Sequence, residues 1–438
     1  MRYYSTGGMS PEVSLAQAVI EGLAPDRGLY MPDRIPVLPD SFYADIADMT
    51  FKEMSMSVAR AFFGEDIPEN DLRRIVEDTL SFDTPLVKVW ENIYSLELFH
   101  GPTLAFKDVG ARFMARLLSW FIMEGMAGDG SGKVTVLAAT SGDTGSAVAN
   151  GFLGVEGIDV IVLYPSAKVS DIQEKQFTTL GRNITALEVD GTFDDCQRLV
   201  KMAFMDMEVR SRLTLTSANS INVARLLPQT FYYFNAYARL KRAGYDGDIV
   251  FSVPSGNFGN LTAGLIAAGM GLPVKHFIAA NNVNDVFLEY LQTGRYSPRV
   301  SVRTIANAMD VGDPSNLARI VDLYKGSVSA LREDVSGCSF TDDDIRNTIS
   351  EVYLRTGYVA DPHGACACRG LMDSLRPGQT GVFLETAHPA KFKDTVGEIL
   401  GTEIQIPERL MAFLDARKQS VKTGGKYDEF KEYLLSRC

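Results

Sequence analysis

The sequence has few of the residues from which metal sites and disulfide frameworks are built. Its 438 residues include four histidines and five cysteines, an odd number that cannot pair completely. Cys366 and Cys368 stand one residue apart, but no second cysteine or histidine pair follows at zinc-site spacing. The chain also starts without the apolar core of a secretory signal. We therefore expect free thiols, among them Cys438, no metal site, and a cytoplasmic location.

Excess positive charge and long apolar runs are also missing. The net charge is −12 and the isoelectric point is near 5.0, whereas nucleic acids and anionic membranes attract clustered cations. The apolar run 120–123 is broken by Glu124 and Gly125, far short of the roughly 20 residues of a membrane span. We expect no nucleic-acid or membrane partner, and an anionic substrate would need a local basic pocket.

The apolar content is high enough to build real cores, at 46% of the chain. A chain of this length is expected to form two or three domains. Helical spacing of apolar residues over 14–23, 51–63 and 71–80 predicts a helical N-terminal segment, 1–95. Longer helical patterns follow at 192–205 and 219–239.

Short apolar runs separated by glycine-rich turns and helical patterns dominate the rest of the chain. Runs of this length are typical of buried parallel strands, and they predict an α/β fold. The expected strands are Val134–Ala139, Val160–Tyr164, Ile184–Val189, Ile249–Val253, His276–Ala280 and Gly381–Glu385.

Lys107 occupies an unusual position for a lysine. The turn signal 100–102 precedes it, and apolar residues from Val109 and Phe113 onward recur at helical spacing, so Lys107 lies in the first turn of an amphipathic helix. Backbone N–H groups and the positive end of the helix dipole disfavour an ammonium there. A neutral amine is what a carbonyl-condensing lysine needs. The alternative is an exposed lysine whose stem covers apolar surface.

Two predicted strands run into polar, glycine-rich turns that open helices. The first turn is Thr140–Ser146 and the second is Pro254–Asn260. A strand, such a turn and a helix N-terminus together hold an anion on backbone N–H groups, although a plain βα turn fits each sequence equally well. The second turn is neither a Walker loop nor a dinucleotide fingerprint.

A third strand ends in 386–392, where His388 lies at a strand's carboxyl end, the place where α/β proteins bind ligands. We interpret His276 and His363 as structural. Helix starts are expected at Thr341, with three acidic residues behind it, and at Asp361.

Taken together, these motifs in this order resemble the threonine synthase family over nearly the whole chain. The motifs are Phe106-Lys107-Asp108, the loop 141–145, the loop 255–260 and the strand end 386–392. The resemblance implies pyridoxal 5′-phosphate as cofactor and two open, mainly parallel sheets with flanking helices, the type II fold of such enzymes. It implies a small α/β domain, 96–235, with the lysine, a large one, 236–438, with the phosphate loop, and a monomer or homodimer.

The resemblance also implies roles for individual residues. Lys107 would carry the cofactor covalently, Thr386 would hydrogen-bond its ring nitrogen, and the cofactor phosphate would rest on Gly256, Asn257, Phe258, Gly259 and Asn260. The amino-acid end of the substrate would face Ser141, Gly142, Asp143, Thr144 and Gly145. Glu385 departs from the family pattern, in which we expect a small residue before the threonine.

The implied reaction converts O-phospho-L-homoserine and water to L-threonine and phosphate. A leaving phosphate needs cations, and the candidates are Arg112 and Arg225, with Lys168 and Lys175 behind them. A serine or threonine dehydratase or a phospholyase of the same fold, and a catalytically silent ligand-binding protein, are the competing interpretations.

Overall fold

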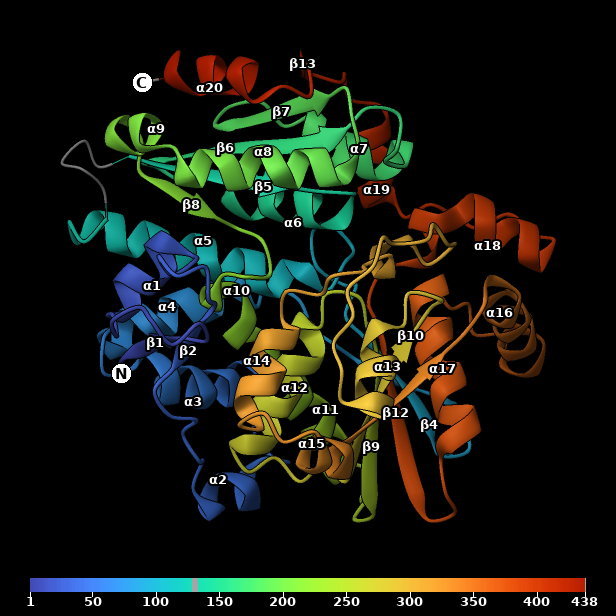
Figure 1. Ribbon diagram of the computed structural model, residues 1–438. Helices are drawn as coiled ribbons and strands as arrows, with labels where there is room; N and C mark the ends of the chain where they lie inside the picture. The colour runs from blue at the N-terminus through green and yellow to red at the C-terminus, as the bar shows by residue number, and fades with distance from the viewer. Residues whose placement is uncertain (128–132, 438) are drawn as a thin grey trace. The chain divides into compact units, whose positions relative to one another are not determined.

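The computed structural model describes residues 1–127 and 133–437, which form two compact units (Figure 1). The first unit consists of Met1–Met31, Lys107–Arg225 and Pro407–Cys438, and the second of Pro32–Phe106 and Leu226–Ile406. No helix in the described part of the chain is long and apolar enough to cross a membrane. Cys196, Cys338, Cys366 and Cys368 are free thiols, as expected, whereas Cys438 lies outside the described residues.

The first unit is built on a parallel sheet. Its elements are β1 (Tyr3–Ser5), α1 (Leu15–Glu21), β2 (Tyr30–Pro32, which runs into the second unit), α5 (Lys107–Met123), β5 (Val134–Ala139), α6 (Asp143–Phe152), β6 (Ile158–Pro165), α7 (Asp171–Thr178), β7 (Ile184–Val189), α8 (Phe193–Met205), α9 (Met207–Arg212), β8 (Leu215–Ser217), α10 (Val223–Leu226), α19 (Glu408–Leu414), β13 (Val421–Thr423) and α20 (Tyr427–Leu435). Among the described residues the strand order is β13-β7-β6-β5-β8, all parallel.

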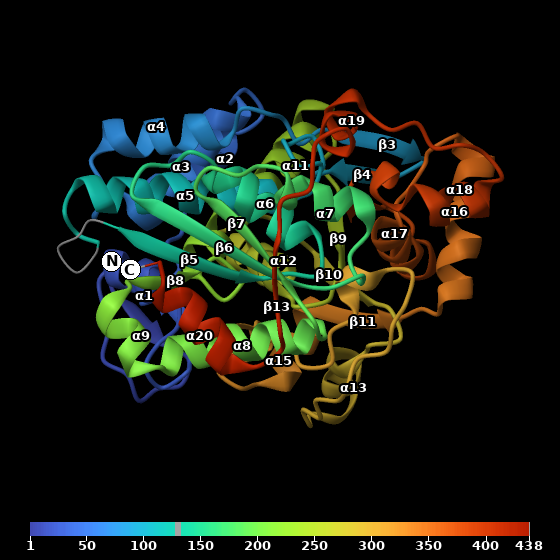
Figure 2. The ribbon, with the colours of Figure 1, turned by 90° about the horizontal axis from the view of Figure 1, so that it is seen from above.

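Helices cover both faces of this sheet, which is why its central strands β5 and β6 are largely apolar and buried rather than alternating. Helices α6 and α8 both contact β5 and β6, and they lie on opposite sides of the sheet in both views (Figures 1 and 2). On the α8 side, Leu137 and Ile161 of the sheet pack with Leu199 of α8 and Phe430 of α20. The carboxyl end of β5 therefore carries the Ser141 loop on a rigid, fully buried strand.

The second unit contains a larger, mainly parallel sheet of order β11-β10-β9-β12-β4-β3. Its elements are α2 (Asp40–Asp45), α3 (Phe51–Phe63), α4 (Glu69–Thr79), β3 (Leu86–Trp90), β4 (Ile93–Glu97), η1 (Leu227–Gln229), α11 (Thr230–Arg242), β9 (Asp248–Pro254), α12 (Gly259–Gly269), β10 (His276–Asn281), α13 (Val286–Thr293), η2 (Asn307–Met309), α14 (Leu317–Leu323), α15 (Val328–Asp334), β11 (Val335–Ser339), α16 (Asp342–Thr356), α17 (Pro362–Ser374), β12 (Gln379–Glu385), η3 (Pro389–Phe392) and α18 (Lys393–Leu400). Only β3, paired with β4, is antiparallel among these described strands.

Alternate residues of the central strands face opposite layers. Val250 and Ile278 join the core under α17, which contacts β9, β10 and β12. Their neighbours Phe251 and Phe277 contact the ring of Tyr233 on α11 instead, at centroid distances of 5.1 and 6.2 Å. Because side chains alternate between the two faces of a strand, each central strand packs against the helices on both sides of the sheet.

The expected α/β class with open, mainly parallel sheets and flanking helices is confirmed, and two details differ. The N-terminal segment is not wholly helical, because it contains β1, β2, β3 and β4 as well as helices. The helix expected over 219–239 is interrupted, since Pro228 lacks an N–H and restricts the residue before it.

Candidate active site

Two of the predicted site segments meet at one edge of the larger sheet. Strands β9 and β12 are parallel neighbours, with Phe383 opposite Ser252, so their carboxyl ends lie at the same edge. Thr386 follows β12 directly, and the loop 256–260 follows β9. In an open α/β sheet, ligands bind outside the carboxyl ends of the strands.

The backbone that leads into Lys107 is fixed to this edge. Phe106 donates its N–H to the carbonyl oxygen of Thr386 at 2.9 Å, and Ala105 forms an antiparallel bridge with Ala387. Lys107 is the next residue, half-buried, and it is the first residue of α5. The predicted helix start and the strand end are therefore neighbours along a hydrogen-bonded backbone, although they are nearly 280 positions apart in the sequence.

Side chains after β12 hold the same segment. Lys391 is almost fully buried and donates from Nζ to the carbonyl oxygen of Thr103 at 2.9 Å. The Nδ1 atom of His388 accepts a hydrogen bond from the N–H of Ala390 at 3.1 Å, which caps η3. Burial, with the neighbouring His100, lowers the pKa of His388 to about 4, so its ring is neutral at pH 7.

The loop before α12 fits a phosphate group. Phe258 takes the left-handed conformation (φ 59°) as the N-cap, which leaves Gly259 and Asn260 in the first helical turn. N–H groups of a first turn have no intrahelical acceptor. The amide oxygen of Asn260 accepts from the hydroxyls of Tyr232 and Tyr233, at 2.7 and 2.8 Å, while its buried Nδ2 has no hydrogen-bond partner. An orphaned buried donor at a helix N-terminus suits a phosphate oxygen.

A buried arginine, Arg319, is linked to this loop by hydrogen bonds, and no pattern in the sequence indicated it. Asn257 accepts from the N–H of Ser315 at its side-chain oxygen (2.6 Å) and from Nδ2 of Asn316 at its carbonyl (3.0 Å). Asn316 in turn accepts from Nη1 of Arg319 at 2.7 Å. Arg319 is fully buried, and burial lowers its pKa to about 9. The chain thus holds the loop rigid and places positive charge near it.

In the first unit, two backbone N–H groups of the Ser141 loop donate to a side chain of the protein itself. The hydroxyl of Thr140 accepts from the N–H groups of Gly142 (3.0 Å) and Gly145 (2.7 Å), and Asp143 accepts from Nε2 of Gln173 at 2.9 Å. Gly142 has φ 149° and a backbone that only glycine readily adopts. These two amides are engaged within the protein, so the donors that the loop offers a ligand are the other N–H groups of the first turn of α6 and the half-buried hydroxyls.

Those hydroxyls belong to Ser141 and Thr144. The two arginines expected near the substrate differ sharply in burial. Arg112 is half-buried in α5. Arg225 is 3% exposed and donates to the carbonyl of Ala218; burial lowers its pKa to about 10, an effect that Asp108 opposes. Arg225 therefore supports the helix that begins at Lys107, and Arg112 is the more accessible cation.

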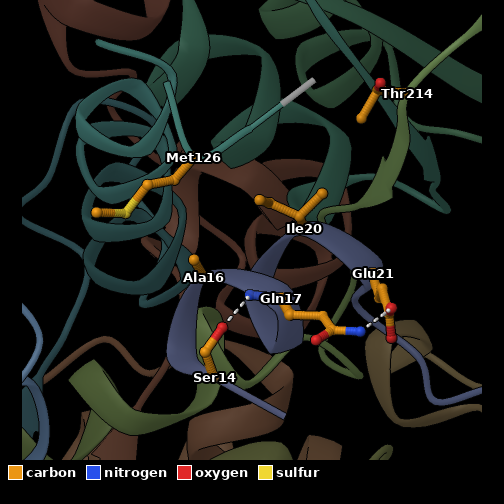
Figure 3. Close-up of a pocket in the computed structure, with 7 residues that line it drawn as sticks. All are labelled: Ser14, Ala16, Gln17, Ile20, Glu21, Met126 and Thr214. Carbon is orange, nitrogen blue, oxygen red and sulfur yellow. Dashed lines mark hydrogen bonds between the residues drawn. The ribbon is translucent and has the colours of Figure 1, made fainter. Parts of the chain in front are cut away.

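A separate open pocket of about 540 Å³ lies in the first unit (Figure 3). It is lined by Ser14, Ala16, Gln17, Ile20, Glu21, Met126 and Thr214. Ser14 caps α1 by accepting from the N–H of Gln17 at 3.2 Å, and Gln17 donates to Glu21 at 2.8 Å. These polar groups stabilise α1 itself, and the pocket contains none of the predicted site residues.

Comparison with known proteins agrees with this geometry. The model of the pyridoxal-phosphate dependent enzymes matches residues 80–386, that of the threonine synthase N terminus residues 2–80, and that of the threonine synthase C-terminal region residues 363–434.

Relatives match over the full length. Threonine synthase of Haemophilus influenzae is 45% identical over 99% of this chain and 100% of its own. The crystal structure of threonine synthase from Escherichia coli superposes with a TM-score of 0.92 at 42% identity, covering all of both chains. A threonine synthase from Brucella melitensis with pyridoxal phosphate bound gives 0.92 at 34% identity, covering 100% of this chain and 99% of that one. The chain therefore belongs to the threonine synthase family of pyridoxal-phosphate dependent enzymes.

Proposed function

We propose that this enzyme converts O-phospho-L-homoserine and water to L-threonine and phosphate. The observation that carries the proposal is the hydrogen bond from Phe106 to Thr386, because it ties the backbone entering Lys107 to the sheet edge that bears the phosphate-type loop. We further propose a cytoplasmic monomer or homodimer. The expected domains 96–235 and 236–438 differ from the two compact units, because residues 96–106 and 226–235 belong to the second unit and residues 407–438 to the first; Lys107 lies in the first unit and the loop 256–260 in the second.

The residues present fit the cofactor. The loop from Gly256 to Asn260 would hold its phosphate, with Arg319 behind it, and the hydroxyl of Thr386 would meet its ring nitrogen. Bound pyridoxal 5′-phosphate supplies an electron-accepting ring that eases proton loss from the carbon next to the amino group. A neutral hydroxyl leaves the ring nitrogen without a proton, which places more of the work on Lys107.

Lys107 would hold the cofactor covalently and then move protons at Cα and Cβ of the substrate. Phosphate leaves from Cγ, which gains a proton to become the methyl group of threonine in place of the proton lost from Cβ, and the hydroxyl of water adds at Cβ. Ser141 and Thr144 would donate to the substrate carboxylate, whereas Arg112 would face the phosphate, which carries close to two charges near neutral pH.

The test is to incubate the purified enzyme with O-phosphohomoserine and to assay threonine and free phosphate together. Equal amounts of both products, absent in Lys107→Ala, are expected. Serine and threonine are offered separately, because release of ammonia and a keto acid from either, with no threonine from O-phosphohomoserine, would identify a dehydratase instead.

A further inference from the structure

A buried chain of hydrogen bonds runs through the second unit from the end of β12. Oε1 of Glu385 accepts from the N–H of Asp361 at 2.5 Å. Oδ1 of Asp361 accepts from the backbone N–H of His363 at 2.8 Å and lies 2.5 Å from Nδ1 of the same residue. Nε2 of His363 accepts from the N–H of Ala308 at 3.2 Å. The three side chains are at most 2% exposed.

The hydrogen-bond partners of His363 determine which of its two ring nitrogens carries a proton. The N–H of Ala308 can only donate, so Nε2 of His363 carries no proton and Nδ1 donates to Asp361. Asp361, the N-cap of α17, accordingly accepts several N–H groups at one carboxylate. The ring of His363 is hydrogen-bonded at both nitrogens, so its role is to hold the backbone of Ala308 in place relative to Asp361.

Each end of this chain reaches a segment that we assign to the cofactor. A Cβ built on Gly256 would lie 2.7 Å from the carbonyl oxygen of Ala308 and 2.9 Å from Cα of Met309. The backbone that His363 holds is therefore the support against which Gly256 packs. At the other end, Glu385 directly precedes Thr386.

Glu385 has an environment that only an uncharged carboxyl tolerates. Burial, and after it the Asp361 carboxylate, raises the pKa of Glu385 well above its ordinary value, and Glu97 adds to this effect. Its Oε2 is buried without a hydrogen-bond partner, and a Cβ at position 364 would lie 1.6 Å from it. The lack of a side chain at Gly364 thus leaves room for the carboxyl group of Glu385, the residue that departs from the family pattern.

We propose that Glu385, Asp361 and His363 are positioning residues that tie the end of β12 to the backbone under Gly256 and so hold the loop in place for the cofactor phosphate. The proposal rests on the assignment of that loop to the phosphate. Removing the acceptor at position 363 takes away the side-chain hydrogen bond that holds the N–H of Ala308, which frees the support to move.

The experiment compares two probes that differ only in the phosphate. The full-length enzyme is loaded with pyridoxal 5′-phosphate or with pyridoxal, and the bound fraction is followed by absorbance as the free concentration varies. His363→Leu is expected to weaken pyridoxal 5′-phosphate about tenfold, or about 1.4 kcal/mol, and pyridoxal less than twofold. His363→Gln, whose side-chain oxygen can accept from Ala308, is expected to restore the preference to within threefold of wild type.

The matched control is His276→Leu, which removes another histidine of the same unit, bonded to Ser336 at 2.9 Å at the start of β10. It should leave the preference unchanged. Equal weakening of both probes by His363→Leu overturns the proposal, as does no weakening; if that variant does not fold, a lost preference in His363→Gln overturns it. If Gly259→Val also leaves the preference intact, it is the loop assignment that fails.

Discussion

Replacing Gly256 by alanine is the sharpest test of the phosphate loop. The added Cβ would meet the carbonyl oxygen of Ala308 at 2.7 Å and Cα of Met309 at 2.9 Å, both backbone atoms, whereas ordinary contacts begin near 3.4 Å. The loop and its support must therefore separate by about 0.7 Å. Overpacking of this kind costs about 1–3 kcal/mol in the free energy of unfolding.

The same shift acts on the cofactor. A displacement of about 0.7 Å stretches an N–H to phosphate hydrogen bond from roughly 2.9 Å to beyond 3.5 Å, where it contributes little. Loss of one charge-assisted hydrogen bond, about 1.5–3 kcal/mol, weakens binding roughly 10- to 150-fold. We expect Gly256→Ala to lose pyridoxal 5′-phosphate on dilution at a concentration at which wild type retains it.

The assay measures bound cofactor by absorbance after dilution, together with unfolding in urea. Gly269→Ala is the control, because Gly269 ends the helix that follows the loop and its Cβ would meet a side chain, the Cγ2 methyl of Ile35 at 3.3 Å, and no backbone atom of another segment within 4 Å. Wild-type cofactor retention in Gly256→Ala, with unchanged stability, would refute the reasoning, since it would show that the loop neither is tightly packed nor holds the phosphate.

Three further predictions follow from the site. Borohydride reduction and peptide mapping should place the pyridoxyl group on Lys107, and a label on any other lysine would contradict the assignment. Arg112→Ala should lower kcat/KM for O-phosphohomoserine about 10- to 100-fold without changing stability. Arg225→Ala removes a buried guanidinium that donates to the carbonyl of Ala218, and it should reduce the free energy of unfolding by about 1.5–3 kcal/mol. Wild-type kinetics in the first variant and wild-type stability in the second would remove both roles. The pKa of His388 falls from 6.5 to about 4 on folding, so its contribution to the free energy of unfolding is complete above pH 6.5 and is lost as the pH falls toward 4, at most about 3 kcal/mol. His388→Gln should therefore flatten the decline in stability between pH 7 and 5. An equally steep decline in the variant would exclude this role for His388.

Local chemistry in the sequence predicted much of the fold. Strands Val134–Ala139 and Ile184–Val189 and the Thr341 cap, with its capping box to Asp344, are confirmed at the predicted residues. Strand β4 was missed. It pairs with β3 beside it in the sequence and with β12, nearly 290 residues later, and no local pattern announces the second pairing. The same holds for the site.

The glycine-rich turns and Lys107 stand out by spacing, whereas the contacts of Asp361 with Glu385, and of Asn316 with Asn257, depend on how distant segments pack. Glu385 was visible only as a departure from the family pattern, and its raised pKa comes first from burial and then from the charges of Asp361 and Glu97 on other elements. A sequence read residue by residue names the reacting groups but not the residues that hold them.

The first unit is formed by three separate segments of the chain, and this sets an order in which the chain can fold during synthesis. Strand β13 pairs with β7, and α20 packs on α8 and α9, yet these elements lie more than 200 residues apart in the sequence. On the ribosome, β7 therefore has an unpaired edge while residues 226–406 of the second unit are made, and exposed edges recruit other chains. A nascent chain halted at residue 406 should be more sensitive to protease, and more readily bound by a chaperone, than one halted after α20. In this enzyme β13 seals a sheet whose first strand in the chain, β5, was made some 280 residues earlier.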